Sequence, residues 1–158
     1  MNQNQQLIEE FYAAFASQNT NTMASCYHKD IKFQDPVFEN LEGKNVMDMW
    51  KMLIERSKGN MEIKFLEIEA NNVSGSAKWI ATYHFSITNR KVVNIIQANF
   101  EFKDGLIIKH VDHFNIWKWS KQAFGLKGLF LGWTSFMQKK IQAQAKISLA
   151  NYQKKHIL

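Results

Sequence analysis

Two strand-like runs joined by a tight turn constrain the fold of this chain more than any other feature. Residues 94–103 form the first run, the second begins at Leu106, and the letters KDG at 103–105 lie between them. In a three-residue loop, Gly105 takes the left-handed position of a type I turn followed by a bulge, which is a common hairpin. A two-residue Asp-Gly turn is the alternative, and it would shift the register by one and exchange the partners. We favour the three-residue loop because it surrounds one carboxylate, that of Asp112, with apolar side chains.

The favoured register places Asp112 on the same side of the sheet as several large apolar residues. Phe100 then faces Ile108, and Ile96 lies across from Asp112. A carboxylate in such a strand costs free energy unless it is paired, exposed to water or used in function. Asp112 is therefore a candidate site on an apolar concave face, or else a carboxylate at the sheet rim that water reaches. His110 lies two residues earlier on the same strand face and can supply a partner charge.

The spacing of apolar residues predicts three helices, then four strands, then a final helix. The helical stretches are 5–17, a short one ending at Tyr27, 45–57 and 134–155, and the strand-like stretches are 61–70, 76–87, 91–102 and the one that begins at Leu106. Helices followed by antiparallel strands make an α+β domain in which helices cover one face of a curved sheet. If Asn89-Arg90 forms a two-residue turn, Trp79 faces Phe100 and shares a face with Asp112.

Composition excludes several classes of protein. With 158 residues, 46% of them hydrophobic, the chain has material for one domain with a real core. Cys26 is the only cysteine, so an internal disulfide and a structural cysteine–metal site are excluded. Five histidines without a tight ligand spacing and the lack of a glycine-rich phosphate loop give no metal site and no cofactor. No signal peptide and no apolar run of membrane-spanning length are present, so we expect a cytoplasmic protein.

Four stretches of the chain follow one another in a specific order: IEEFYAAF, SCYHKDIKFQDP, GKNVMDMW and FEFKDGLIIKHVDHFNIW. Together they resemble the nuclear transport factor 2-like (NTF2-like) superfamily, which includes ketosteroid isomerase, limonene epoxide hydrolase and the polyketide cyclases. The resemblance implies a cone-shaped α+β fold, with N-terminal helices on a strongly curved antiparallel sheet and a pocket on its concave face. It covers residues 5–120, and the tail resembles an extension of a bacterial SnoaL-like subgroup. We therefore expect an NTF2-like (SnoaL-like) domain at 1–120 and a C-terminal helical extension at 121–158 packed on it.

The family's functional positions carry over in part. Asp35 precedes a proline and matches the general-base aspartate of ketosteroid isomerase, whereas that enzyme's two oxyanion donors fall on Phe11 and Ala98. Steroid isomerisation is therefore not expected. Asp112, in HVDHFN, matches an aspartate of limonene epoxide hydrolase that belongs to an acid–base pair around a water. These matches make Asp112 and Asp35 candidate catalytic residues, and His110 is the third because it lies two residues from Asp112 on the same strand face. Asp35 can also be a turn residue whose side chain bonds the backbone near Pro36.

Aromatic side chains either pack the core of the cone or line its pocket for a flat apolar ligand. We expect core residues at the base of the cone and pocket-lining residues near its mouth. The six candidate ligand-binding residues are Tyr12, Trp50, Trp79, Tyr83, Phe100 and Phe114. Two function classes stay open. One is an enzyme with aspartate acid–base chemistry, of isomerase, epoxide hydrolase or cyclase type, on an apolar small molecule. The other is a non-catalytic domain for ligand binding or dimerisation.

The charge of the tail differs from that of the rest. The formal net charge is +6, yet no Asp or Glu follows Asp112, and the same segment carries eight lysines and several aromatic residues. This combination is typical of a segment that binds an anionic partner or a membrane surface. It is also typical of a helix and loop that pack on the domain with their lysines in water. We expect residues 124–133 to pack against the pocket mouth, without stable membrane insertion or nucleic-acid binding. The resemblance further implies a homodimer through the outer sheet face, at Val111, Lys109 and Gln97.

Overall fold

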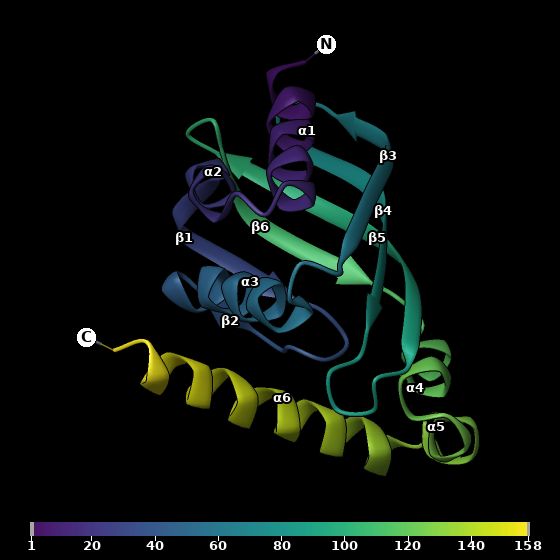
Figure 1. Ribbon diagram of the computed structural model, residues 1–158. Helices are drawn as coiled ribbons and strands as arrows, with labels where there is room; N and C mark the ends of the chain where they lie inside the picture. The colour runs from purple at the N-terminus through teal and green to yellow at the C-terminus, as the bar shows by residue number, and fades with distance from the viewer. Residues whose placement is uncertain (1, 158) are drawn as a thin grey trace.

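The computed structural model describes residues 2–157 as a curved, unclosed six-stranded sheet with helices packed on its concave side (Figure 1). The elements are α1 (Gln3–Ala16), α2 (Thr20–Cys26), β1 (Tyr27–Gln34), β2 (Leu41–Glu42), α3 (Lys44–Ser57), β3 (Glu62–Ala70), β4 (Ser74–His84), β5 (Lys91–Lys103), β6 (Leu106–His113), α4 (Ile116–Phe124), α5 (Leu126–Leu131) and α6 (Ser135–Lys155). The strand order is β2-β1-β6-β5-β4-β3, and all neighbours are antiparallel except β1 and β6. The α+β class and the extra C-terminal helix are as the sequence predicted.

Helix α1 begins with a capping box and buries its apolar stripe on the sheet. The Asn2 side chain accepts a hydrogen bond from the backbone N–H of Asn4, and the Gln5 side chain accepts one from the N–H of Asn2. Four large residues of the stripe are buried, namely Ile8, Phe11, Tyr12 and Phe15. The rings of Tyr12 and Phe15 contact aromatic residues of α3 and of the sheet, so side chains fill the base of the cone.

The β5–β6 hairpin corrects the favoured register. Lys103 pairs with Leu106, and Asp104 and Gly105 both have positive φ, of 53° and 75°, so the loop has two residues. The three-residue loop was wrong, because a type I′ turn, with left-handed geometry at both positions, matches the twist of the strands. A bulge after Phe102 then adds a residue to β6, so Phe100 pairs with His110 instead of Ile108. The shorter loop and the bulge each shift the register by one residue, so the total shift is two. Because side chains alternate with a period of two, Asp112 stays on the inner face.

The β4–β5 connection, by contrast, is longer than predicted, and the inner face again keeps the predicted residues. His84 pairs with Lys91, and Trp79 pairs with Ile96 instead of Phe100, four positions from the expected partner. Because four is even, Trp79 keeps its side of the sheet. Trp79, Phe100 and Asp112 are all buried on the face that α1 covers. The prediction that these three residues share the concave face is confirmed.

Helix α4 lies beside the edge of β5 where strand β6 ends. The last β6 pair joins Gln97 to His113, so β5 has no strand beside Val93 on that edge. The Gln122 side chain fills the place: its Oε1 accepts from the Val93 N–H at 2.7 Å, and its Nε2 donates to the Val93 carbonyl at 3.1 Å. The amide thus satisfies backbone groups that a strand would otherwise pair.

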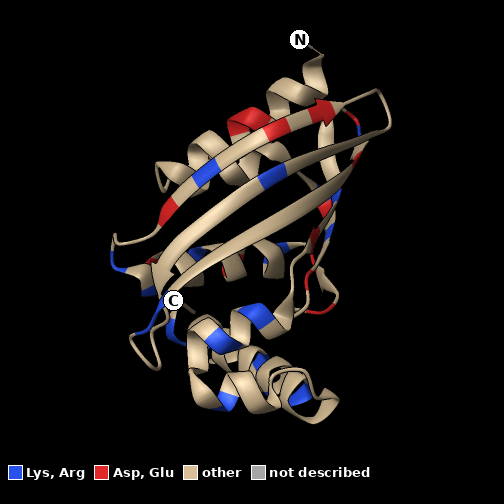
Figure 2. Ribbon diagram, turned by 90° about the vertical axis from the view of Figure 1, so that its right-hand side faces the viewer, with Lys and Arg blue, Asp and Glu red and all other residues tan. Residues whose placement is uncertain are grey.

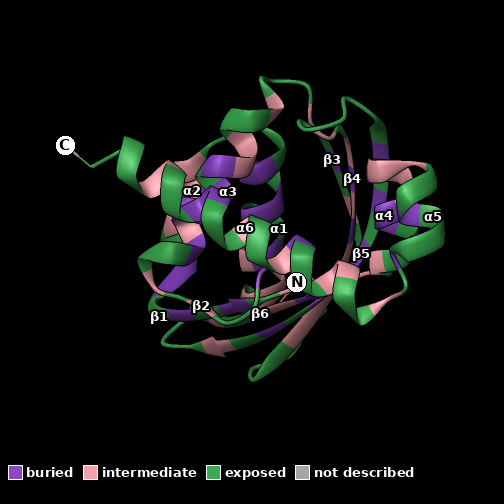
Figure 3. Ribbon diagram, turned by 90° about the horizontal axis from the view of Figure 1, so that it is seen from below, coloured by how far each residue is buried: buried purple, intermediate pink, exposed green. Residues whose placement is uncertain are grey.

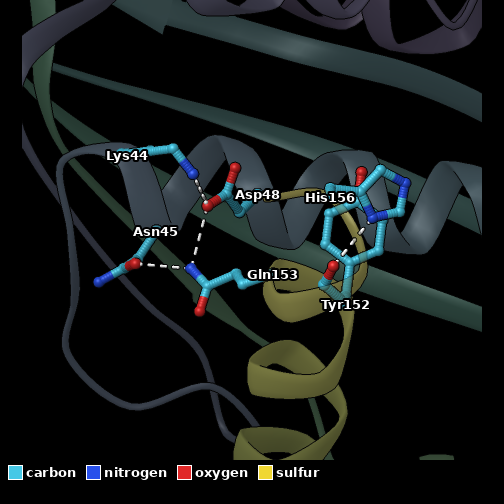
Figure 4. Close-up of polar contacts among 6 residues, drawn as sticks. All are labelled: Lys44, Asn45, Asp48, Tyr152, Gln153 and His156. Carbon is cyan, nitrogen blue, oxygen red and sulfur yellow. Dashed lines mark hydrogen bonds and ion pairs between the residues drawn. The ribbon is translucent and has the colours of Figure 1, made fainter. Parts of the chain in front are cut away.

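Helix α6 crosses below the cone and is fastened to α3 by polar contacts (Figure 4). Gln153 Nε2 donates to Asp48 Oδ2 at 3.0 Å and to Asn45 Oδ1 at 2.8 Å, and the Asp48 carboxylate also accepts from Lys44. These donors lower the pKa of Asp48, against the opposing effect of its burial. Ile141 and Leu149 of α6 are buried, which adds apolar contacts along the same helix.

Helix α5 departs from the predicted packing of residues 124–133. Phe124 faces the interior as expected. By contrast, Leu126, Phe130 and Trp133 are 72%, 67% and 65% exposed, and Figure 3 shows α5 as the outer layer beside the buried side of α4. The packing prediction is therefore wrong for most of this segment. No helix within residues 2–157 has both the length and the apolar character to cross a bilayer.

Candidate functional site

A cavity of about 200 Å³ lies between α3, the concave sheet face and the C-terminal helices. Four of the six predicted ligand-binding residues line it, together with both candidate carboxylates: Trp50, Trp79, Tyr83, Phe114, Asp35 and Asp112. Helices α4 and α6 supply further wall residues, among them Trp119 and Ile141. The C-terminal helices thus close a space that the cone alone would leave open.

Two of the predicted lining residues, Tyr12 and Phe100, lie outside this lining. Tyr12 is 1% exposed in the aromatic core, where its ring stacks on Phe65 at 5.9 Å between centroids. Its hydroxyl is buried, and no described residue hydrogen-bonds to it. Burial, with a smaller effect of the Asp112 charge, raises the pKa of Tyr12 well above its ordinary value. Both residues therefore belong to the packed base of the cone.

Asp112 is 2% exposed and is held through one carboxylate oxygen, Oδ1. His110 Nε2 lies 3.0 Å from Oδ1, and Trp79 Nε1 donates to the same oxygen at 3.3 Å. The described residues give Oδ2 no hydrogen bond. Since Asp112 also lines the cavity, Oδ2 is available to a bound molecule or water.

A chain of hydrogen bonds behind Asp112 fixes the histidine. His110 is fully buried, its Nδ1 lies 2.7 Å from the Tyr27 hydroxyl, and that hydroxyl accepts from Trp50 Nε1 at 3.0 Å. With Asp112 as a carboxylate, Nε2 carries the imidazole proton, and Nδ1 accepts from the Tyr27 hydroxyl. Every donor in the chain then points toward the carboxylate. A neutral histidine in one tautomer satisfies each group without a buried positive charge.

Asp35 directly follows β1, where it is a turn residue and also lines the cavity. Its Oδ1 accepts from the backbone N–H of Val37 at 2.7 Å and of Phe38, a turn that brackets Pro36. The carboxyl group also lines the cavity with Asp112. Burial, helped by the negative charge of Asp112 and opposed by the two backbone donors, raises the pKa of Asp35 to about 7. A group with this pKa holds a proton in half of the molecules near neutral pH.

Tyr83 is another of the polar residues that line the cavity. Its hydroxyl accepts from Trp119 Nε1 at 2.8 Å, so its own proton is not used in that bond. Burial, together with the Asp35 charge, raises the pKa of Tyr83 to about 12, against the opposing bond from Trp119. The hydroxyl therefore stays protonated at neutral pH and can donate to a ligand oxygen.

Tyr27 is the member of this network that sequence reasoning missed. It lies 83 residues before His110 in the chain, at the start of the one strand that runs parallel to β6. The sequence places a tyrosine at the end of a short helix, and no local pattern links it to His110. His110 itself lies behind Asp112, outside the cavity lining.

A second hollow, of about 590 Å³, lies on the outer sheet face and is lined by polar residues and by Val111 and Lys109. It lies on the side of the sheet away from the two carboxylates, since Val111 and Asp112 point to opposite faces of β6. The cavity with the two carboxylates is therefore the better candidate site, although it is smaller. The homodimer predicted at the outer face stays a prediction. Among residues 2–157, no three His, Cys, Asp or Glu side chains are grouped closely enough to hold a metal ion.

Comparison with known families matches a SnoaL-like domain to residues 8–110. The chain belongs to the SnoaL-like domain family. The matched residues begin within α1, include Asp35 and His110 and end two residues before Asp112, so the C-terminal helices lie beyond them. No curated protein sequence matches the chain.

Solved structures show that this SnoaL-like protein has the NTF2-like fold. An LEH-like epoxide hydrolase of M. tuberculosis is 19% identical, with a TM-score of 0.62 over 81% of this chain and 92% of the other. A candidate polyketide cyclase of Xanthomonas campestris is 17% identical, with a TM-score of 0.64 over 76% and 96%. A candidate ketosteroid isomerase of Kribbella flavida is 15% identical, with a TM-score of 0.55 over 72% and 78%. At these identities the likeness concerns the fold, and the chemistry must be argued from the site.

Proposed function

We propose that this protein is an enzyme that carries out acid–base chemistry on a small apolar molecule, with Asp112 as base and Asp35 as acid. The observation that carries the proposal is that both carboxyl groups line one cavity in different environments. Asp112 accepts from two buried N–H groups, whereas burial raises the pKa of Asp35 to about 7. Two carboxyl groups in unlike surroundings can divide the roles of base and acid.

The reaction class follows from what the two groups can exchange. For hydrolysis of an epoxide, Asp112 Oδ2 takes a proton from water while the water oxygen attacks a ring carbon. The ring C–O bond breaks, and protonated Asp35 gives its proton to the oxygen that leaves. A proton then returns from Asp112 to Asp35, so the sum is epoxide plus water to diol. The same pair would move a proton between two positions of a ketone, and the activities named for the structural neighbours are consistent with either reaction.

The cavity limits the substrate to a small, largely apolar molecule with one or two oxygens. Its volume of about 200 Å³ is below the 300–1,000 Å³ that is common for ligand sites. Trp50, Trp79 and Phe114 supply flat apolar walls. The Tyr83 hydroxyl is a donor for a substrate oxygen, because its pKa of about 12 keeps it protonated.

The first experiment screens small epoxides, lactones and ketones for thermal stabilisation and then for turnover. Asp112→Asn keeps the shape of the side chain and removes its ability to accept a proton, so kcat should fall by about 10²–10⁴. Asp30→Asn is the matched control, because that carboxyl group is 67% exposed on β1. Full activity of the Asp112→Asn variant on a substrate of the parent would contradict the proposed base.

A non-catalytic ligand-binding domain is the second candidate. It is favoured by one observation, that two backbone donors already occupy Asp35 Oδ1 in a turn. In that case the parent protein binds a ligand without turnover. Chemical analysis of the ligand after incubation with the protein distinguishes the two candidates.

A further inference from the structure

The corner formed by α5 and the start of α6 holds several exposed large apolar residues. We call the apolar face the set Leu126, Leu129, Phe130, Leu131, Trp133 and Phe136, whose members are 40–74% exposed. Single exposed apolar residues are normal on a protein surface, but a contiguous group marks a site of interaction. These six residues fall within one stretch of 11 along the chain, from Leu126 to Phe136.

The exposure results from the way α5 packs. The small residues Gly128 and Gly132 turn toward Ser120 of α4: a Cβ at Gly128 would overlap the Ser120 backbone, and one at Gly132 would lie 2.6 Å from the Ser120 Cβ. The inward side of α5 therefore consists of glycine, and its large side chains point to solvent. The indole N–H groups of Trp117 and Trp133 donate to the carbonyls of Leu129 and Phe130, which holds the corner in this form. The apolar face is thus built into the packing of the corner.

Exposed lysines lie on α5 and α6, which carry the apolar face, and on the neighbouring α4. Lys118, Lys127, Lys139 and Lys140 are exposed on the same three helices, and Lys121 lies over the Trp117 ring at 4.3 Å. Figure 2 shows lysines and no acidic residue on these helices, since no Asp or Glu follows Asp112. Leu, Phe and Trp beside lysines, with no acidic group, form the composition that binds the interface of an anionic bilayer.

We infer that the apolar face and its lysines form a docking surface for anionic membranes. The lysines contact lipid phosphates, and the apolar side chains enter the interface without crossing the bilayer. A second copy of the chain is a poorer occupant, because a two-fold contact would bring lysines against lysines. Nucleic acid fits the charge, but Leu126, Leu129 and Leu131 have no stacking partner on it.

Sedimentation with lipid vesicles tests the inference in the full chain. We expect binding to vesicles of phosphatidylglycerol and phosphatidylcholine in equal parts, loss of binding at high salt, and none to phosphatidylcholine alone. Leu126→Ser/Phe130→Ser should weaken binding about tenfold or more. Lys127→Gln/Lys139→Gln/Lys140→Gln should weaken it about 100-fold, at about fivefold per lysine. Tryptophan emission should shift to shorter wavelength when the parent binds.

Matched variants distinguish vesicle binding through this surface from a general effect of the protein's charge or of its exposed apolar residues. Val73→Ser/Ile147→Ser removes two residues that are 70% and 53% exposed elsewhere, and Lys29→Gln/Lys91→Gln/Lys103→Gln removes three exposed lysines. Both should bind as the parent does, and circular dichroism checks that all variants fold. Absence of parent binding at low salt, or equal losses in the matched variants, would overturn the inference. So would a dimer that Leu126→Ser/Phe130→Ser dissociates while vesicle binding is absent.

Discussion

Asp112 and Phe130 both depart from the usual division of polar residues outside and apolar residues inside, in opposite directions. Asp112 is 2% exposed in the interior, whereas Phe130 is 67% exposed on α5. The interior network compensates for its polar groups through hydrogen bonds from His110 and Trp79. Phe130 has no such compensation within the fold. Hydrogen bonds within the fold thus hold one oxygen of the buried Asp112 carboxylate, whereas most of the Phe130 side chain is exposed to solvent.

The largest effect on stability is expected from His110→Leu, which leaves the carboxylate of Asp112 buried without its histidine. Breaking a buried polar pair in this way costs about 3–5 kcal/mol of unfolding free energy. Urea unfolding measures the loss, with His113→Leu as the control on the exposed side of the same strand. A loss below about 1 kcal/mol would mean that water or another group already satisfies Asp112.

Asp35→Asn is expected to change the pH dependence of stability. Because the folded protein raises the pKa of Asp35 from 3.8 to about 7, the folded state binds a proton more tightly than the unfolded state does. Stability therefore falls as pH rises from 4 to 7, and the cost at pH 8 reaches a few kcal/mol. Asn keeps the acceptor for the turn without this cost. The variant should gain thermal stability relative to the parent at pH 8 and little at pH 4, and equal differences at both values would contradict the raised pKa.

Tyr27→Phe tests the chain behind the histidine and should have an intermediate effect. Without the hydroxyl, Trp50 Nε1 and His110 Nδ1 both lose their partner, at a cost of about 1–3 kcal/mol. Tyr83→Phe is the comparison, since the Tyr83 hydroxyl bonds Trp119 alone among the described side chains. Chemical denaturation should show a larger loss of unfolding free energy for Tyr27→Phe than for Tyr83→Phe. The reverse order would contradict the role of Tyr27 in the hydrogen-bond network.

Phe130→Ser should have the smallest effect on the isolated protein. Its side chain makes little contact with the fold, so we expect a change within about 0.5 kcal/mol in unfolding free energy. A loss of several kcal/mol would show that α5 folds back on the cone in solution, as the sequence first suggested. The difference in unfolding free energy between Phe130→Ser and His110→Leu then compares the exposed corner with the buried network directly.

Alternation along the strands determined which side chains enter the cone. Both predicted loop lengths were wrong, yet Trp79, Phe100 and Asp112 lie on the inner face, because each net register shift was even. The pattern of period two carries this information in every strand and does not depend on the turns. The same pattern places His110 and Asp112 on one strand face. The helices were predicted from helical spacing of apolar residues, and the family from the resemblance of four stretches of the sequence.

Contacts between distant residues were decided by the tertiary structure alone. Tyr27 reaches His110 because β1 runs parallel to β6, and the sequence holds no sign of that pairing. The exposure of Phe130 depends on the fit of Gly128 against Ser120, whereas its apolar neighbours suggested burial. A sequence specifies how apolar each residue is, but which surface lies opposite it is settled only when the helices pack.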